Sequence, residues 1–184
     1  MRLFTAIDLP PEVAEKIAVL LARLRPTARL KWSSVDNLHI TTKFIGEWPQ
    51  ERLGELLFAL GGLPARLPIP IGVRGLGWFP NPRAPRVFWV GVEAGPALAA
   101  LARDTDRALA ELGIAPESRP FSPHLTLARI KERTPLDSVR QAFASLPGEE
   151  FGEFTADRFN LYQSELGPSG SVYTRIEELV FGRS

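Results

Sequence analysis

LHITTKFIGE, residues 38–47, and PHLTLARI, residues 123–130, each carry a histidine, one apolar residue and a threonine in succession. His39 and His124 are the only two histidines in the 184-residue chain. Apolar and polar residues alternate around both of them, which predicts two β-strands. Because both histidines stand in one pattern, we expect them to share a task.

The elements expected around these two strands follow one order twice: strand, helix, histidine strand, helix, strand. The first series covers residues 2–8, 10–25, 38–46, 49–62 and 68–78, and the second covers 86–92, 95–113, 123–130, 135–148 and 154–166. A last strand, 171–181, follows the turn GPSG and should form a hairpin with the strand before it. An α+β chain of this length can show such a rhythm by chance, but the matching histidines favour a structural repeat.

Composition excludes several classes of protein. The net charge of +1 is too balanced for a protein that wraps long duplex nucleic acid. The chain has no cysteine, so disulfides and thiolate metal sites are excluded, and two histidines alone argue against structural zinc. Asp8 interrupts the short apolar run at the N-terminus, so we expect no signal peptide and a soluble, cytoplasmic protein.

The two motifs place matched chemical groups on one face of each strand. Since residues i and i+2 of a strand share a face, His39, Thr41 and Lys43 should point the same way, as should His124 and Thr126. If the two strands face one cleft, one imidazole can act as general base and the other as general acid. The threonine hydroxyls can donate hydrogen bonds to phosphoryl oxygens. This set suits displacement at phosphorus without a metal, and no G-x-S-x-G nucleophile elbow is present.

We expect several other conspicuous residues to have a structural and not a catalytic role. We expect Lys43 to be an ordinary solvated lysine, although it could steer anions. Phe44 should belong to the core rather than stack on a base. Trp32 and Trp78 should pack against the lobes, and ELGPSG, residues 165–170, should be a plain hairpin turn.

The paired motifs resemble the two-histidine (2H) phosphoesterases. With RLFTAIDLP at the start and LYQSELGPSGSVYTRIEEL near the end, nearly the full length is similar to the RNA 2′,3′-cyclic phosphodiesterase, or 2′-5′ RNA ligase, family. The resemblance implies an α+β bilobal fold: two lobes related by a pseudo-twofold axis, each with an antiparallel sheet and helices, flank an active-site cleft. Residues 1–184 would form one such domain, with repeat halves of approximately 1–80 and 81–184.

The resemblance also implies a reaction and the residues that perform it. A terminal 2′,3′-cyclic phosphate would be hydrolysed to a 2′-phosphomonoester, with His39 and His124 as the acid/base pair. Thr41 and Thr126 would hold the phosphate. Arg129 occupies a family arginine position, although simple alternation from His124 points it away from the cleft. We take His39 as the acid that protonates O3′ and His124 as the base that activates water, a division the sequence does not determine.

Other functions fit the same residues. The same site could serve a small cyclic nucleotide or an ADP-ribose cyclic phosphate, or a non-catalytic module could bind RNA ends. A 5′-hydroxyl in place of water would give 2′-5′ RNA ligase activity. We expect no metal and no other cofactor, an RNA terminus with a 2′,3′-cyclic phosphate as the partner, no membrane association, and a monomer.

Overall fold

Two antiparallel sheets organise residues 1–182, which the computed structural model describes. The β1 sheet has the strand order β3-β1-β8-β9, and the β5 sheet has the order β2-β6-β5-β4-β7. The strands are β1 (Arg2–Asp8), β2 (Lys31–Trp32), β3 (His39–Glu47), β4 (Ile69–Phe79), β5 (Val87–Glu93), β6 (His124–Arg129), β7 (Glu150–Ala156), β8 (Arg158–Gly167) and β9 (Gly170–Val180).

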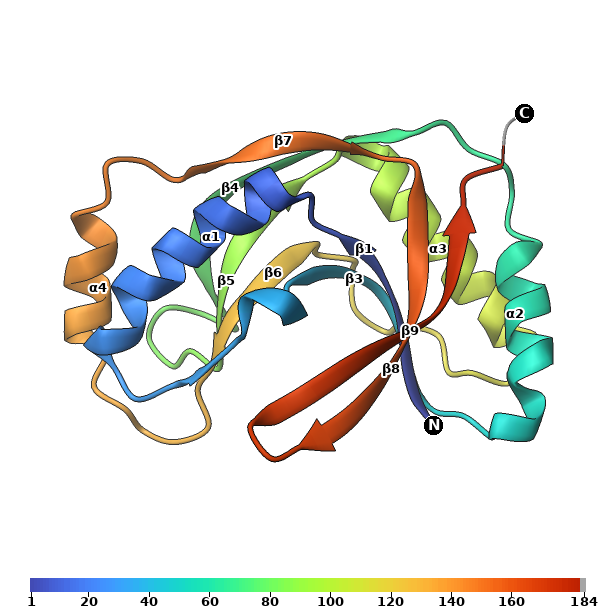
Figure 1. The fold of residues 1–184 in the computed structure, drawn as a ribbon, viewed down its shortest axis with the longest axis horizontal. Helices are drawn as coiled ribbons and strands as arrows, with labels where there is room; N and C mark the ends of the chain where they lie inside the picture. Colours follow the sequence, from blue (N-terminus) through green and yellow to red (C-terminus); the bar gives the residue numbers. More distant parts are fainter. Residues whose placement is uncertain (183–184) are drawn as a thin grey trace.

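Helices cover the outer face of each sheet (Figure 1). The four α-helices are α1 (Pro11–Leu24), α2 (Leu53–Gly61), α3 (Gly95–Ala110) and α4 (Asp137–Ala144), and the short 3₁₀ helices are η1 (Arg25–Thr27), η2 (Val35–Asn37) and η3 (Gln50–Arg52). Helix α1 follows β1 yet packs with α4 against the β5 sheet, whereas α3 follows β5 and packs with α2 against the β1 sheet. The two halves of the chain therefore exchange helices.

Helix α1 shows why the sequence folds this way locally. Pro11 stands at its first position, where the missing N–H costs nothing. Its buried side chains recur at helical spacing: Val13, Ile17, Leu20, Leu21 and Leu24. The resulting apolar stripe joins a core that extends through both lobes, so the lobes are held together by packing as well as by the chain.

The predicted α+β bilobal fold is confirmed, with two errors in the strands: the short strand β2 was not expected, and one expected strand is divided in two. The single strand expected at 154–166 is two strands, because β7 ends at Ala156 in the β5 sheet and β8 begins at Arg158 in the β1 sheet. Buried Ala156 and Phe159 flank the crossing, so the apolar pattern continues while the chain changes sheets at Asp157. The expected hairpin is confirmed, with β8 and β9 paired up to Gly167 and Gly170.

Neither sheet is built from one half of the chain. The β1 sheet combines strands from both ends, and β4 of the first half lies between β5 and β7 of the second. The division into halves near residue 80 therefore describes a repeat in sequence order and stays a prediction as a domain boundary. Within residues 1–182, the helices are too short or too polar to span a lipid bilayer.

Candidate active site

Strands β3 and β6 meet where the two lobes adjoin, and they follow the same local plan. The six side chains of His39–Phe44 are partly buried, buried or exposed in the same order as those of His124–Arg129. Each strand has a β-bulge directly after its motif threonine. On β3, neighbouring Ala6 and Thr5 of β1 pair with Thr41 and Lys43, so the residue between Thr41 and Lys43 is left out of the register. On β6, the residue after Thr126 is left out of the register in the same way. Because a bulge reverses the alternation, the fifth residue after each histidine returns to the side of the histidine.

Both imidazoles are held in the same way. His39 Nδ1 lies 2.7 Å from the carbonyl oxygen of Asn37, and His124 Nδ1 lies 2.8 Å from the carbonyl oxygen of Ser122. A carbonyl only accepts hydrogen bonds, so each Nδ1 carries the proton and donates it. In the neutral rings each Nε2 then keeps its lone pair and is available to take up a proton.

Burial and nearby charges shift the pKa of both histidines. Burial is the largest effect on His39 and lowers its pKa from 6.5 to about 4; the Asn37 carbonyl and Asp8 oppose this shift, while His124 and Arg129 add to it. Burial also lowers the pKa of His124, helped by the charge of Arg129 and opposed by the Ser122 carbonyl. One guanidinium therefore lies within electrostatic range of both imidazoles, at the position that the β6 bulge turns back toward them.

The motif threonines have different neighbours. Thr41 pairs with Ala6, whereas Thr126 pairs with Trp89 on β5. The indole of Trp89 lies against Gly77 of β4 so closely that an added Cβ would come within 2.2 Å of the ring. This glycine lets the indole lie flat on the sheet beside Thr126.

A carboxylate and several aromatic rings surround His39. Asp8 is its partner on the neighbouring strand, and the imidazole stacks on Phe4 with ring centroids 4.7 Å apart. Tyr173 lies edge-on to it at 5.2 Å. The residue opposite His124 is Gly91, and Phe79 lies edge-on to that imidazole at 5.0 Å. The two motifs match, but their surroundings do not.

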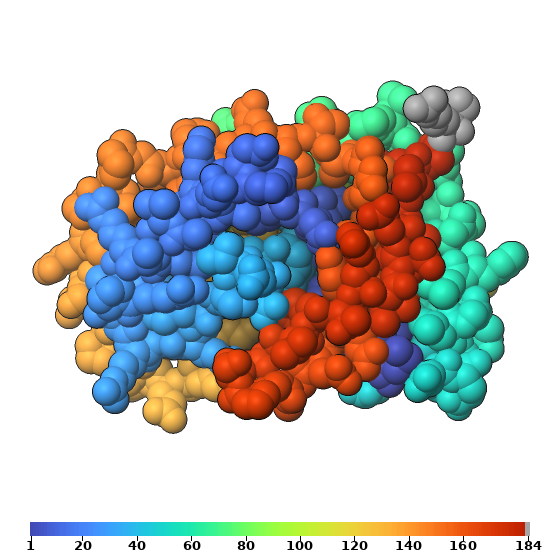
Figure 2. Space-filling model, in the orientation of Figure 1, coloured from blue at the N-terminus to red at the C-terminus, as the bar shows by residue number. Residues whose placement is uncertain are grey.

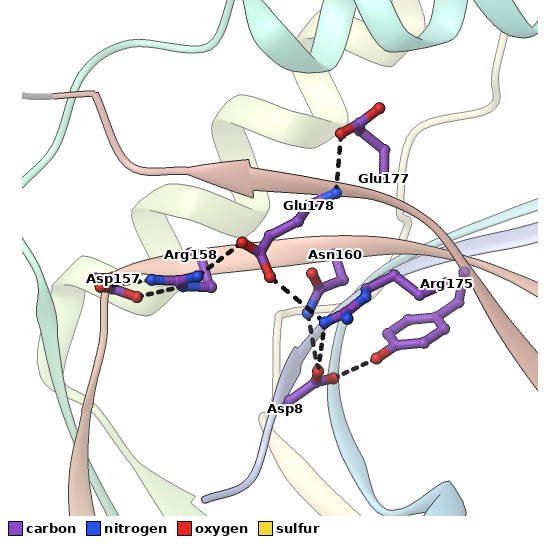
Figure 3. A network of polar contacts seen from close by, with 8 residues as sticks. Asp8, Asp157, Arg158, Asn160, Arg175, Glu177 and Glu178 are labelled. Carbon is purple, nitrogen blue, oxygen red and sulfur yellow. Dashed lines mark hydrogen bonds and ion pairs between the residues drawn. The ribbon is translucent and has the colours of Figure 1, made fainter.

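Strands β8 and β9 hold the Asp8 carboxylate in place (Figure 3). It accepts hydrogen bonds from the Tyr162 hydroxyl at 2.7 Å and the Asn160 amide at 3.0 Å, and Arg175 lies 4.0 Å away. Burial and the hydrogen bond to Asp8 raise the pKa of Tyr162, so its hydroxyl stays a donor. The network fixes a negative charge beside His39.

A hollow of about 370 Å³ opens next to His39. Its lining includes Asp8, Asp36, Tyr173 and Arg175. A larger hollow of about 610 Å³ lies over β4, β7 and the start of α3, where Arg74 forms ion pairs with glutamates. Because that larger hollow has no histidine in its lining, the candidate active site is the one at His39.

Known proteins match the chain over nearly its whole length. A model of the LigT-like phosphoesterase family matches twice, at residues 7–89 and 90–173. The chain belongs to this family. An Archaeoglobus fulgidus protein named RNA 2′,3′-cyclic phosphodiesterase is 36% identical over 94% of this chain and 96% of its own length. A Thermus thermophilus protein of the same name is 38% identical over 97% of this chain and 89% of its own.

Solved structures of the family agree with this fold. A crystal structure of a Thermus thermophilus protein superposes with a TM-score of 0.81 at 35% identity and covers 98% of both chains. The crystal structure of Escherichia coli LigT complexed with 3′-AMP has a TM-score of 0.77 at 27% identity, covering 99% of this chain and 98% of that one. The double match of the family model agrees with the repeat that the two histidine motifs indicated.

Two interpretations of side chains near the family motif were wrong. Lys43 is buried, with its ammonium 2.5 Å from Asp106 and 2.8 Å from the Ala115 carbonyl, and Phe44 is 57% exposed. Both errors have one cause, because the bulge after Thr41 reverses the alternation on which they relied. The same kind of bulge, after Thr126, corrects the expectation that Arg129 faces away.

The tryptophan and turn interpretations are confirmed. Trp78 is buried and stacks on Phe88 at 4.3 Å, and the Trp32 indole donates to the Ala28 carbonyl. The turn after Gly167 is a plain hairpin turn.

Sequence reasoning missed Asp8, Tyr162, Tyr173 and Arg175 as neighbours of His39. One signal was available, because the chain has only two tyrosines and both belong to the last hairpin. Among residues 1–182, no group of three or more histidine, aspartate or glutamate side chains is arranged to hold a metal ion.

Proposed function

We propose that this chain is a metal-independent RNA 2′,3′-cyclic phosphodiesterase that leaves a 2′-phosphomonoester. Its family is that of the LigT-like phosphoesterases, and relatives from several organisms carry the cyclic phosphodiesterase name. The observation that carries the proposal is the shared arrangement of His39 and His124. Each donates its Nδ1 proton to a backbone carbonyl, which leaves each Nε2 free for proton transfer.

The reaction is an in-line displacement at phosphorus. Water attacks the cyclic phosphate while the Nε2 of His124 takes its proton. The bond from phosphorus to O3′ breaks on the opposite side, and the Nε2–H of protonated His39 gives its proton to O3′. The product has a 3′-hydroxyl and a phosphoryl group on O2′, and the two histidines have exchanged protonation states.

Substrate binding favours the protonated form of His39, which the acid role requires. Without a ligand, burial keeps both imidazoles neutral near pH 7, which suits the base and not the acid. An anionic phosphate beside His39 favours the protonated ring, as Asp8 already does. The acid is therefore charged mainly when substrate is present.

Hydroxyls and one guanidinium stabilise the charge that develops on the phosphoryl oxygens. Thr41 and Thr126 lie two residues after the histidines on the same faces and can donate their O–H groups. Arg129 adds a fixed positive charge within range of both imidazoles. A 5′-hydroxyl in place of water at the same step gives a 2′-5′ linkage, which is the proposed ligase activity.

The test is hydrolysis of an oligonucleotide that ends in a 2′,3′-cyclic phosphate, measured in excess chelator. Phosphorus NMR should show phosphate on O2′ alone. His39→Ala and His124→Ala should each lower kcat/KM by about 10²–10⁴-fold. Thr41→Ala should cost about 10–1000-fold, as expected for a lost hydrogen-bond donor to the transition state. Thr155→Ala, at an exposed position on β7, is the matched control and should keep full activity.

Two results would contradict the proposal: near-full activity in either histidine variant, or activity that returns only when a metal is added. A mononucleotide with the same cyclic phosphate, assayed in parallel, separates an RNA enzyme from one that acts on small cyclic nucleotides.

A further inference from the structure

The hollow beside His39 lies between η2 and the β8–β9 hairpin. The Asn37 amide donates to the Ser171 carbonyl at 2.7 Å and joins the two segments, which adjoin on the face shown in Figure 2. Buried Leu38 and the rings of Tyr162 and Tyr173 contribute apolar surface to its lining. Its volume of about 370 Å³ falls in the range typical of small-molecule sites.

The geometry of the in-line displacement indicates which part of the substrate lies in this hollow. In an in-line displacement the attacking water and the leaving O3′ lie on opposite sides of phosphorus. If His39 protonates O3′, the ribose that carries O3′ must lie on the side of His39. The hollow opens on that side, since His39 belongs to its lining and His124 does not.

The charges of the hollow suit the neutral part of a nucleotide. Asp8 and Asp36 contribute two carboxylates, and Arg175 contributes one guanidinium, which Asp8 and Glu178 already face at 4.0 and 3.4 Å. A second phosphate would be repelled by this excess of negative charge. A nucleoside offers hydroxyl and N–H donors, for which carboxylates are strong acceptors.

Of the two carboxylates, Asp36 is the one whose oxygens can accept hydrogen bonds from a ligand. Asp8 already accepts from Tyr162 and Asn160, whereas Asp36 is exposed on η2 and, among residues 1–182, has no hydrogen bond or ion pair from its side chain. The base that best fits a free carboxylate is guanine, because its N1–H and N2–H groups point the same way and match two carboxylate oxygens. Uracil presents one N–H between two carbonyls and would set these acceptors against the carboxylate.

We propose that this hollow is the subsite for the terminal nucleoside, with Tyr173 as the stacking surface for the base and Asp36 as a selector for guanine. The proposal rests on the proposed function and extends it by naming the base. A carboxylate that pairs with the base raises kcat/KM for guanosine over uridine by about 10-fold or more. Loss of an aromatic stacking partner lowers affinity for either base by about 10-fold.

The experiment compares guanosine and uridine 2′,3′-cyclic phosphates as substrates for the full chain. The wild type should prefer guanosine, and Asp36→Asn should remove most of this preference, because guanosine loses a paired carboxylate and the uracil carbonyls no longer face a negative charge. Tyr173→Ala should raise KM for both substrates, whereas Tyr173→Phe should not. Glu51→Gln, which removes an exposed carboxylate from another 3₁₀ helix, is the matched control and should keep the preference.

Equal rates for the two bases in the wild type would overturn the proposal, as would an unchanged preference in Asp36→Asn while hydrolysis continues. Equilibrium binding of guanosine 2′-monophosphate separates the two levels of inference. If the wild type hydrolyses neither substrate yet binds this nucleotide in an Asp36-dependent way, the proposed function fails and the subsite stands. Weak binding that is the same in wild type and Asp36→Asn removes the subsite.

Discussion

Replacing Lys43 with methionine tests how strongly the two halves of the chain are joined next to the active site. The Lys43 side chain is 2% exposed, and its ammonium reaches the carboxylate of Asp106, the carbonyl of Ala115 and, at 3.7 Å, the carboxylate of Glu117. Asp106 also accepts the backbone N–H of Glu117 at 3.1 Å. One buried cation on β3 thus fastens the end of α3 and the segment that leads to His124.

The expected cost follows from what the substitution leaves behind. Methionine fills the space of the lysine stem but leaves the Asp106 carboxylate without its cation. Removing one partner of a fully buried ion pair costs about 3–5 kcal/mol. Asp106 is 22% exposed, so water can replace part of the lost interaction, and we expect a loss of about 2–4 kcal/mol. For a chain of this size that loss corresponds to a Tm lower by roughly 4–16 °C.

Equilibrium unfolding in urea, followed by tryptophan fluorescence, measures this loss. Adding Asp106→Asn to Lys43→Met should recover part of the stability, because the uncompensated charge is removed while an oxygen remains for the Glu117 N–H. Glu55→Gln breaks the exposed Arg52–Glu55 pair and should cost less than about 1 kcal/mol. If Lys43→Met costs no more than Glu55→Gln, the buried pair does not hold the segment as the structure suggests.

Three further predictions concern the site itself. Arg129→Gln should lower kcat/KM by about 10²–10³-fold, and NMR titration should show the pKa of both histidines rising, because the charge that lowers them is gone; unchanged values would place the guanidinium elsewhere. Gly77→Ala should lower both stability and activity by displacing the Trp89 ring, whereas Gly54→Ala, with open space around it, should lower neither. The folded-state pKa of His39 is about 4, against 6.5 for a histidine in an unfolded chain, so its contribution to stability is complete above pH 6.5 and is lost as the pH falls toward 4. The full loss amounts to about 3 kcal/mol, of which about 2.5 kcal/mol falls between pH 7.5 and 4.5. Unfolding curves at these two pH values should show a pH dependence smaller by about this amount in His39→Asn than in the wild type, and equal pH dependence in both proteins would contradict the assignment.

The sequence was sufficient for the fold class and the two motif strands, because both depend on local apolar periodicity. It failed where a single residue changes the phase of that periodicity. One extra residue after Thr41 buries Lys43 and exposes Phe44, and its counterpart after Thr126 turns Arg129 toward the histidines. A bulge depends on pairing with a neighbouring strand, and pairing is not visible in one strand's own pattern.

The change of sheet at Asp157 was hidden for a similar reason. Buried residues lie on both sides of it, so the pattern continues while the hydrogen-bond partners change from β4 to β1. The surroundings of His39 were missed because they come from both ends of the chain. Asp8 and Tyr162 are separated by 154 positions, and only the exchange of strands between the two halves brings them together.

A duplicated motif supplies two equivalent histidines, yet the reaction needs one acid and one base. The motif strands cannot break this symmetry, because their burial patterns and their Nδ1 hydrogen bonds are the same. The neighbouring strands do break it, since Asp8 lies opposite His39 and Gly91 lies opposite His124. A carboxylate stabilises a protonated imidazole and a glycine does not, so Asp8 supports the proposed acid role of His39, whereas burial, which lowers the pKa of His39 to about 4, opposes that role until substrate binds. Under the proposed mechanism, the difference between the two histidines would therefore come from β1 and β5, the strands beside the motifs.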